Sequence, residues 1–310
     1  MQTNPPIVPC PLRRGDRIGL FSPAGPVRDK NRVAAGVRLL HELGFRTRQL
    51  RSTREGLDYL AADDRTRADE LHTLWADDEI QALMAVRGGY GCLRIIDNLD
   101  FALFRSRPKL LIGFSDVTVL LNTISERAGL ITLHGPVVSS LIDCDRESLE
   151  AFASLLYGDL HEYRFPRQVE VLRPGSASGI LRGGNLATVV HMLGTPWETS
   201  WEGALLFLED TGEPMYKIDR MLTQLNLSGR LKNLAGLILG TFDSREVTDG
   251  RRLQEQVWSR VLELTAQCGY PVLGGFPAGH LETNHPLPIG AQATLDTGSG
   301  RLLLHGLGKS

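Results

Sequence analysis

The sequence predicts an α/β protein whose first half is a doubly wound, mostly parallel sheet and whose second half is a smaller α/β domain. Three observations predict this class. Short apolar runs alternate with amphipathic helical stretches from the amino end onward, which is the order of βαβ units. The chain has 310 residues, which fits two medium domains. Its composition, 42% hydrophobic and 23% charged, is that of a globular protein with a sizeable core.

The first half contains five strand candidates separated by helical periodicity. Each helical stretch has apolar residues three and four positions apart, which places them on one face of a helix. Together these elements predict a doubly wound α/β domain over residues 1–157. We expect strands at residues 17–22, 45–50, 82–86, 109–114 and 130–134, and helices at 29–43, 65–76, 93–99, 115–128 and 146–156.

The pattern changes at residues 158–178, where periodicity is lost and Pro, Gly and Ser gather. This composition predicts a linker. Beyond it we expect a second domain over residues 179–310, which ends in a β-hairpin around the turn TGSG. The expected elements are helices at 185–193, 216–225 and 252–268, and strands at 204–208, 235–241, 272–276, 293–296 and 301–305.

Charge and composition exclude several classes of partner. The formal net charge is -2 and no dense Lys/Arg cluster occurs, so nucleic acid is not an expected partner. No apolar run approaches the length of about eighteen residues that a membrane helix needs, and the first nine residues do not resemble a secretion signal. We therefore expect a soluble, cytoplasmic protein.

The cysteines indicate neither a metal nor a redox centre. They occur singly, without C-x-x-C spacing, and no H-E-x-x-H motif is present, so we expect reduced thiols and no metal. Reduced thiols agree with a cytoplasmic location. The four are Cys10, Cys92, Cys144 and Cys268.

The most informative segment is KLLIGFSDVTVLLNTI, residues 109–124, in which an apolar strand leads directly into a helix at Ser115. Such a turn presents a serine hydroxyl at the carboxyl edge of the sheet, where the next backbone N–H and the helix dipole stabilise an oxyanion. The alternative is that Ser115 is only a helix N-cap, with Asp116 in the first turn. Val117 replaces the second glycine of G-x-S-x-G, so the motif is incomplete.

A glycine-rich turn, RGGYG at residues 87–91, follows the strand predicted at 82–86. Glycines allow a ligand to approach the backbone closely. The spacing matches neither G-x-G-x-x-G nor the lysine-bearing P-loop, which argues against a nucleotide site. A turn that supplies an oxyanion N–H fits better, because it lies at the same sheet edge as Ser115.

An acid and two histidines complete the candidates. The strand LLFLED at residues 205–210 ends in Glu209 and Asp210, and the loop GHLETNHPLPIG at residues 279–290 carries His280 and His285. Serine, acid and histidine supply the three roles of a catalytic triad, in which the acid orients the base and the base activates the hydroxyl.

Simpler roles remain open for these residues. The acid could instead be a surface carboxylate paired with Lys217 or Arg220 on the next predicted helix. Each histidine could be a hydrogen-bonded loop residue. A non-catalytic module that binds a small anion on the same scaffold is the third alternative.

Six motifs together resemble the LD-carboxypeptidase family, the serine peptidases that include murein tetrapeptide carboxypeptidases and microcin C self-immunity proteins. The resemblance covers nearly the whole chain. It implies a class I glutamine amidotransferase-like amino-terminal domain, a smaller carboxy-terminal α/β domain and a homodimer. The motifs, in chain order, are GDRIGLFSPAGPV, RGGYG, GFSD, GGNL, LEDTGEPMYKIDRML and GHLETNHPLPIG.

The resemblance also implies roles for individual residues. Ser115 matches the nucleophile, Glu209 the acid and His280 the histidine, with His285 as the rival base; the triad is then divided between the two domains. Backbone N–H groups of Asp116 and of the RGGYG turn, at Gly89, would form the oxyanion hole. Two further residues, Asn185 of GGNL and Arg220 of IDRML, are expected to bind substrate or support the site.

The characteristic reaction of this family removes the terminal D-alanine from a murein tetrapeptide, after L-lysine or meso-diaminopimelate, without a metal or organic cofactor. The immunity branch instead hydrolyses an amide between an aminoacyl group and a nucleotide-like part, and tends to carry a tryptophan-bearing loop after the GGNL helix. Here the segment GTPWETSWEG at residues 194–203 is short but contains Trp197 and Trp201, so the immunity activity is the alternative.

Overall fold

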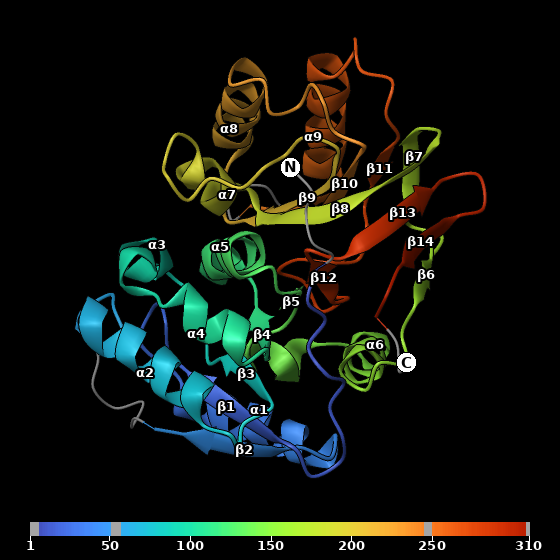
Figure 1. The fold of residues 1–310 in the computed structure, drawn as a ribbon. Helices are drawn as coiled ribbons and strands as arrows, with labels where there is room; N and C mark the ends of the chain where they lie inside the picture. Colours follow the sequence, from blue (N-terminus) through green and yellow to red (C-terminus); the bar gives the residue numbers. More distant parts are fainter. Residues whose placement is uncertain (1–5, 51–56, 245–249, 308–310) are drawn as a thin grey trace.

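The computed structural model describes residues 6–50, 57–244 and 250–307, which form two β-sheets with helices packed around them (Figure 1). Sheet order in the first half is β12-β5-β4-β3-β1-β2. The five strands from the amino-terminal half are parallel to one another, as expected of βαβ units. They are β1 (Arg17–Phe21), β2 (Arg46–Gln49), β3 (Ala82–Ala85), β4 (Leu110–Gly113) and β5 (Thr132–His134).

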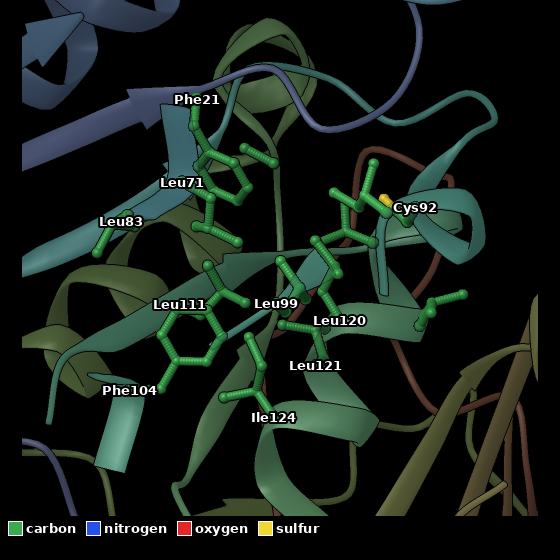
Figure 2. Close-up of a cluster of buried hydrophobic side chains, with 14 of the residues drawn as sticks. Phe21, Leu71, Leu83, Cys92, Leu99, Phe104, Leu111, Leu120, Leu121 and Ile124 are labelled. Carbon is green, nitrogen blue, oxygen red and sulfur yellow. The ribbon is translucent and has the colours of Figure 1, made fainter. Parts of the chain in front are cut away.

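Helices cover both faces of this sheet, and strand residues alternate between two cores. Leu83 and Leu111 face a core that also contains Leu71 of α2, Phe104 of α4 and Leu120 of α5 (Figure 2). The neighbouring strand residues instead face α1 and α6. Both faces are therefore buried, as in doubly wound folds. The helices are α1 (Lys30–Glu42), α2 (Asp64–Ala76), α3 (Cys92–Ile95), α4 (Phe101–Ser106), α5 (Thr118–Ala128) and α6 (Arg146–Leu156).

The second sheet has the order β6-β14-β13-β8-β9-β10-β11-β7. Its central strands β8 to β11 are parallel, and its outer strands are antiparallel. Three helices cover one face: α7 (Leu186–Met192), α8 (Met215–Leu227) and α9 (Gly250–Leu264). The central strands are β8 (Ser176–Asn185), β9 (Ala204–Thr211), β10 (Gly236–Asp243) and β11 (Val272–Gly274), and the predicted closing hairpin is β13 (Gln292–Asp296) with β14 (Arg301–Leu304).

The segment predicted as a linker, residues 158–178, contains β-strands. It contains β6 (Glu162–Arg164), β7 (Glu170–Arg173) and the start of β8, and these strands belong to the second sheet. Strands of three or four residues are too short to show an alternating pattern, and β6 and β7 lie at the two edges of the sheet. The Pro and Gly residues of the turns between these strands are therefore the feature that predicts a linker.

A strand from the second half extends the first sheet. β12 (Leu287–Ile289) pairs antiparallel with β5, so that the chain returns to the amino-terminal sheet after β11. This pairing brings the loop before β12, which contains His280 and His285, close to the carboxyl ends of β4 and β5. Within the described ranges, no helix combines the length and apolarity needed to cross a bilayer.

Candidate active site

The candidate residues lie where strands of both sheets end. Ser115 follows β4, and the RGGYG turn follows β3, which is the neighbour of β4 in the first sheet. Glu209 lies near the end of β9 in the second sheet, and His280 lies in the loop after β11. Parallel strands end at one edge of a sheet, so each sheet contributes its carboxyl edge to this region.

Ser115 has a left-handed backbone conformation, with φ of 61°. A non-glycine residue in this region costs about 1–3 kcal/mol, and such strain is concentrated at functional sites. The residue before it, Phe114, is extended, so the chain reverses sharply between β4 and the helical turn at Ser115–Val117. This is the geometry of a nucleophile elbow.

The alternative that Ser115 serves as an N-cap is wrong. Phe114 occupies the cap position of the first helical turn and Val117 that of α5, and neither cap has a side-chain hydrogen bond. The strained conformation of Ser115 thus has no capping role that would explain it.

The glycine turn lies directly against Ser115. A Cβ atom built on Gly88 would lie 3.1 Å from the Ser115 Oγ, so only glycine fits at this position without displacing the hydroxyl. Within the described residues, the backbone N–H groups of Gly89 and Asp116 donate no hydrogen bond. Free N–H groups next to a serine hydroxyl are what an oxyanion requires.

The side chain of Asp116 holds this turn in place. Its Oδ2 accepts a hydrogen bond of 2.8 Å from the backbone N–H of Cys92, the first residue after the turn. Arg67, which is fully buried, donates to the carbonyl of Gly91 at 2.9 Å. Burial raises the pKa of Asp116, although the bond from Cys92 counteracts it. A buried arginine and a partly buried aspartate therefore fix the turn beside Ser115.

Glu209 and His280 form a pair in which the acid is fully buried and the histidine partly so. The His280 Nδ1 lies 2.7 Å from the Glu209 Oε2, and the Glu209 side chain is fully buried. Gly279 permits this contact, because a Cβ atom there would lie 3.0 Å from the same carboxylate oxygen. The alternative that Glu209 is a surface acid paired with Lys217 or Arg220 is therefore wrong; Lys217 pairs with Glu213.

The electrostatics of the pair keep the carboxylate ionised. Burial by itself would raise the pKa of Glu209, but the attraction of His280 and its hydrogen bond outweigh burial and lower the pKa. Burial would also lower the pKa of His280, yet the charge of Glu209 and the hydrogen bond raise it. Because an ionised carboxylate can only accept, the His280 Nδ1 carries the proton in this bond.

His280 lies beside the elbow, and His285 does not share its environment. The rings of His280 and Phe114 are 4.5 Å apart between centroids. The His285 ring stacks on Tyr163 at 5.3 Å, and its Nε2 lies 3.7 Å from the exposed Glu147. Of the two histidines, His280 is thus the one that the structure joins to Glu209.

Asn185 and Arg220 occupy different surroundings. The Asn185 Oδ1 accepts from the Thr188 backbone N–H as the N-cap of α7, and its Nδ2 donates to Asp210 at 3.1 Å. Asn185 is also in register with Glu209 across β8 and β9. Arg220 is exposed on α8 and lies over the ring of Tyr216, away from the other candidates among the described residues.

A cavity of about 390 Å³ opens beside the His280 ring. Its walls come from the elbow, from the turn before α6 and from the His280 loop, so it collects residues far apart in sequence. No group of His, Cys, Asp and Glu within the described ranges could hold a metal ion. The lining residues are Phe114, Ser140, Asp143, Cys144, Gly279, His280, Leu281, Glu282 and Asn284.

Sequence reasoning missed residues that act through long-range contacts. Phe114 packs against His280 across the two halves of the chain, and His134 at the end of β5 is fully buried near the pair. The available signal for His134 was a histidine at the end of the strand predicted at 130–134. A single histidine there has no partner in the local sequence, so its surroundings could not be inferred.

Comparison with known protein families identifies both halves of the chain. Residues 18–135 match the model of the LD-carboxypeptidase N-terminal domain, and residues 178–295 match that of the LD-carboxypeptidase C-terminal domain. The chain belongs to the LD-carboxypeptidase family. Members of this family are serine-type carboxypeptidases, and the protein is an enzyme of this type.

Curated relatives of this LD-carboxypeptidase align over nearly their full length. The probable murein peptide carboxypeptidase of Bacillus subtilis (strain 168) is 36% identical over 296 residues, covering 93% of this chain and 91% of the relative. The murein tetrapeptide carboxypeptidase of Pseudomonas aeruginosa is 32% identical, with coverage of 90% and 93%. The microcin C7 self-immunity protein MccF of Escherichia coli is 28% identical, with coverage of 94% and 93%.

Solved structures share the fold. The muramoyltetrapeptide carboxypeptidase from Oxalobacter formigenes superposes with a TM-score of 0.79 at 28% identity, covering 93% of this chain and 97% of that one. Microcin C7 self-immunity protein MccF in its apo state superposes with a TM-score of 0.89 at 24% identity, covering 98% and 100%. The two-domain α/β architecture is therefore that of the LD-carboxypeptidase family.

Proposed function

We propose that this enzyme hydrolyses the bond between an L-diamino acid and the terminal D-alanine of murein tetrapeptides, with Ser115, His280 and Glu209 as a catalytic triad. The observation that carries the proposal is the 2.7 Å contact between His280 and the buried Glu209, with the His280 ring packed on Phe114, the residue before a serine whose φ is 61°. A base oriented by a buried acid, beside a strained serine, is the arrangement that acyl transfer needs.

In this mechanism the His280 Nδ1–H donates to Glu209, which leaves Nε2 to take the proton of the Ser115 hydroxyl. The Ser115 oxygen attacks the carbonyl carbon of the L-diamino acid, and the backbone N–H groups of Gly89 and Asp116 stabilise the oxyanion. His280 then gives the proton to the amine of the leaving D-alanine, forming an acyl-enzyme. Water, deprotonated by His280, hydrolyses the ester and restores Ser115.

The cavity next to His280 supports a peptide substrate. Its walls include Leu281 and Phe114 as well as the carboxylate of Glu282, so it offers both apolar surface and negative charge. The Asp143 carboxylate in the same wall already pairs with Arg32. Negative charge complements the side-chain ammonium of L-lysine or meso-diaminopimelate. A cytoplasmic homodimer acting on recycled cell-wall peptides completes the proposal, and light scattering of the purified protein tests the dimer.

The deciding experiment is to incubate the purified enzyme with murein tetrapeptide and to measure released D-alanine. We expect release by the wild type and a loss of at least about 10³-fold in kcat for Ser115→Ala, because the nucleophile is removed while the fold remains. The matched control is Ser125→Ala, a buried serine on α5, the helix that follows the elbow. No release of D-alanine by the wild type would exclude the proposed activity.

The immunity activity is the second candidate, because MccF is among the relatives of the chain. The two tryptophans that suggested this activity, however, have structural roles. The Trp197 indole donates to Asp97 at 2.7 Å and packs on Phe101, and Trp201 is buried. Adding an aminoacyl sulfamoyl adenosine as a second substrate distinguishes the two: faster hydrolysis of that compound than of the tetrapeptide would favour the immunity activity.

A further inference from the structure

A third histidine lies close to the Glu209–His280 pair and has no role in the mechanism above. His134 is the last residue of β5 and is fully buried. It is in register with Gly113 of β4, two residues before Ser115. Its ring meets Phe207 at 5.0 Å and Phe114 at 6.1 Å between centroids, both nearly perpendicular. One aromatic ring from each half of the chain thus packs against His134.

The polar atoms of His134 are not satisfied by the protein. Neither ring nitrogen has a hydrogen-bond partner within the described residues, and the same is true of the Glu209 Oε1, which is also buried. A buried polar group without a partner costs about 1–3 kcal/mol and calls for an explanation. One donor and one acceptor, each buried and without a hydrogen bond in the described part of the chain, thus occur in the same cluster, and the Asn185 side chain also lowers the pKa of Glu209.

Gly184 lies beside the His134 ring. Gly184 of β8 is in register with Leu208, the residue before Glu209. A Cβ atom on Gly184 would lie 2.6 Å from the Thr118 Oγ1 and 3.3 Å from the His134 Nδ1, so any other residue would collide with Thr118 and crowd the ring. His134 also interacts electrostatically with both Glu209 and His280.

We propose that His134 is a positioning residue for Glu209: its neutral imidazole donates a hydrogen bond, through one ordered water, to the Glu209 Oε1, while His280 occupies Oε2. Buried waters join polar groups that the protein leaves unpaired, and a water needs two or more such partners. The inference rests on the proposed function in one respect, namely that Glu209 orients the catalytic base.

The protonation state of His134 suits this role. Burial lowers the pKa of His134 to about 4, the attraction of Glu209 notwithstanding. At neutral pH the ring is therefore an uncharged donor. A second positive charge beside Glu209 would compete with His280 and disfavour its imidazolium form, which must form during catalysis. A neutral donor fixes the carboxylate without this repulsion.

Other charged groups also act on His280, and the experiment must separate them from His134. Besides Glu209, the carboxylates of Asp210 and Asp243 raise the pKa of His280. None of these carboxylates is changed when His134 is replaced. A displaced His280 titration in a His134 variant therefore reports on the orientation and charge of Glu209.

The test measures the His280 titration by NMR in the full-length protein with isotope-labelled histidine. In the wild type we expect a pKa above 6.5. In His134→Phe the Glu209 carboxylate is no longer held in the orientation that faces the His280 Nδ1, so we expect the His280 titration to move to lower pH by about half a unit or more. His134→Gln retains an N–H donor without a titrating ring and should restore most of the wild-type value.

The matched control is His285→Phe. His285 is likewise buried, and neither of its ring nitrogens has a hydrogen-bond partner among the described residues, but it stacks on Tyr163 and lies beside Glu147. This variant should leave the His280 titration unchanged. If His134→Phe also leaves the titration unchanged while lowering stability, His134 has only a structural role and the inference is wrong.

Two further measurements test the role of His134. If His134→Phe does not fold, the nitrogen shifts of His134 in the wild type decide: a ring that becomes protonated above pH 5 contradicts a neutral donor. With murein tetrapeptide, His134→Phe should lower kcat about tenfold with KM unchanged. The pH at which kcat/KM falls on the acid side should shift downward together with the His280 titration. A wild type that releases no D-alanine would exclude the proposed function, whereas the NMR result would still stand.

Discussion

Gly88 lies so close to Ser115 that a Cβ atom at position 88 would be 2.9 Å from the Ser115 Cβ and 3.1 Å from its Oγ. The two residues are 27 positions apart in the sequence and meet because β3 and β4 are neighbours in the parallel sheet. The turn between β3 and α3 thus defines one wall around the hydroxyl.

We therefore expect Gly88→Ala to lower kcat/KM by at least about 100-fold, because the methyl group displaces the Ser115 side chain by a fraction of an ångström or more. The thermal unfolding temperature should change little, because moving the Ser115 side chain relieves the clash with the new methyl group. Gly269→Ala is the control: nothing lies within 4 Å of a Cβ atom there, so its activity should equal that of the wild type. Full activity in Gly88→Ala would show that Ser115 can move freely.

Asp116 should matter through its side chain as well as its backbone. In Asp116→Ala the Cys92 N–H loses its acceptor, which costs about 1–3 kcal/mol of unfolding free energy and loosens the RGGYG turn. We expect kcat to fall about tenfold with KM nearly unchanged. Asp116→Asn keeps an oxygen acceptor and should recover most of the activity. Equal losses in both variants would mean that the negative charge, not the hydrogen bond, is what counts.

Replacing the acid should alter both rate and pH dependence. In Glu209→Gln the charge that raises the pKa of His280 is lost, while burial, which lowers it, remains. The acid limit of kcat/KM should move to lower pH, and kcat should fall by about 10²–10⁴-fold because the base loses its orientation. The pH–rate profile measures both. Glu147→Gln, next to His285, is the matched control and should have no effect.

Much of the first half could be predicted because its strands are buried on both faces. Apolar runs such as residues 82–86 and 109–114 stand out from the helices between them, and the structure confirms them as β3 and β4. The second half was harder. β8 reads SASGILRGGN, a mixture of small and polar residues without alternation, because its glycines approach β9 and α5 closely. Its pairing partners, and so the register of Asn185 with Glu209, could not be read from the sequence.

In the site, too, some residues could be identified from the sequence and others could not. Motif resemblance singled out Ser115, Glu209 and His280, since each lies in a distinctive local segment. The contacts of Gly88 with Ser115 and of Phe114 with His280 depend on strand order and on β12 returning to the first sheet, which is a long-range pairing of three residues. Such contacts have no local signature, and His134 was overlooked for the same reason.

The buried imidazole of His134 should make stability depend on pH. Its pKa is about 4 in the folded state against 6.5 when exposed, so between these values the unfolded chain binds a proton that the folded chain does not. The unfolding free energy should therefore fall as the pH decreases from 6.5 towards 4, with an upper limit of about 3 kcal/mol from this group.

Denaturant unfolding of the wild type and His134→Gln at pH 7 and pH 4.5 measures this effect. The variant has no titrating ring at position 134, so its loss of unfolding free energy between the two pH values should be smaller than that of the wild type by about 2 kcal/mol. His161→Gln, which removes an exposed histidine, should keep the wild-type difference. An identical difference in all three proteins would mean that residue 134 already carries a proton in the folded state, because only a group with the same protonation in both states leaves the slope unchanged.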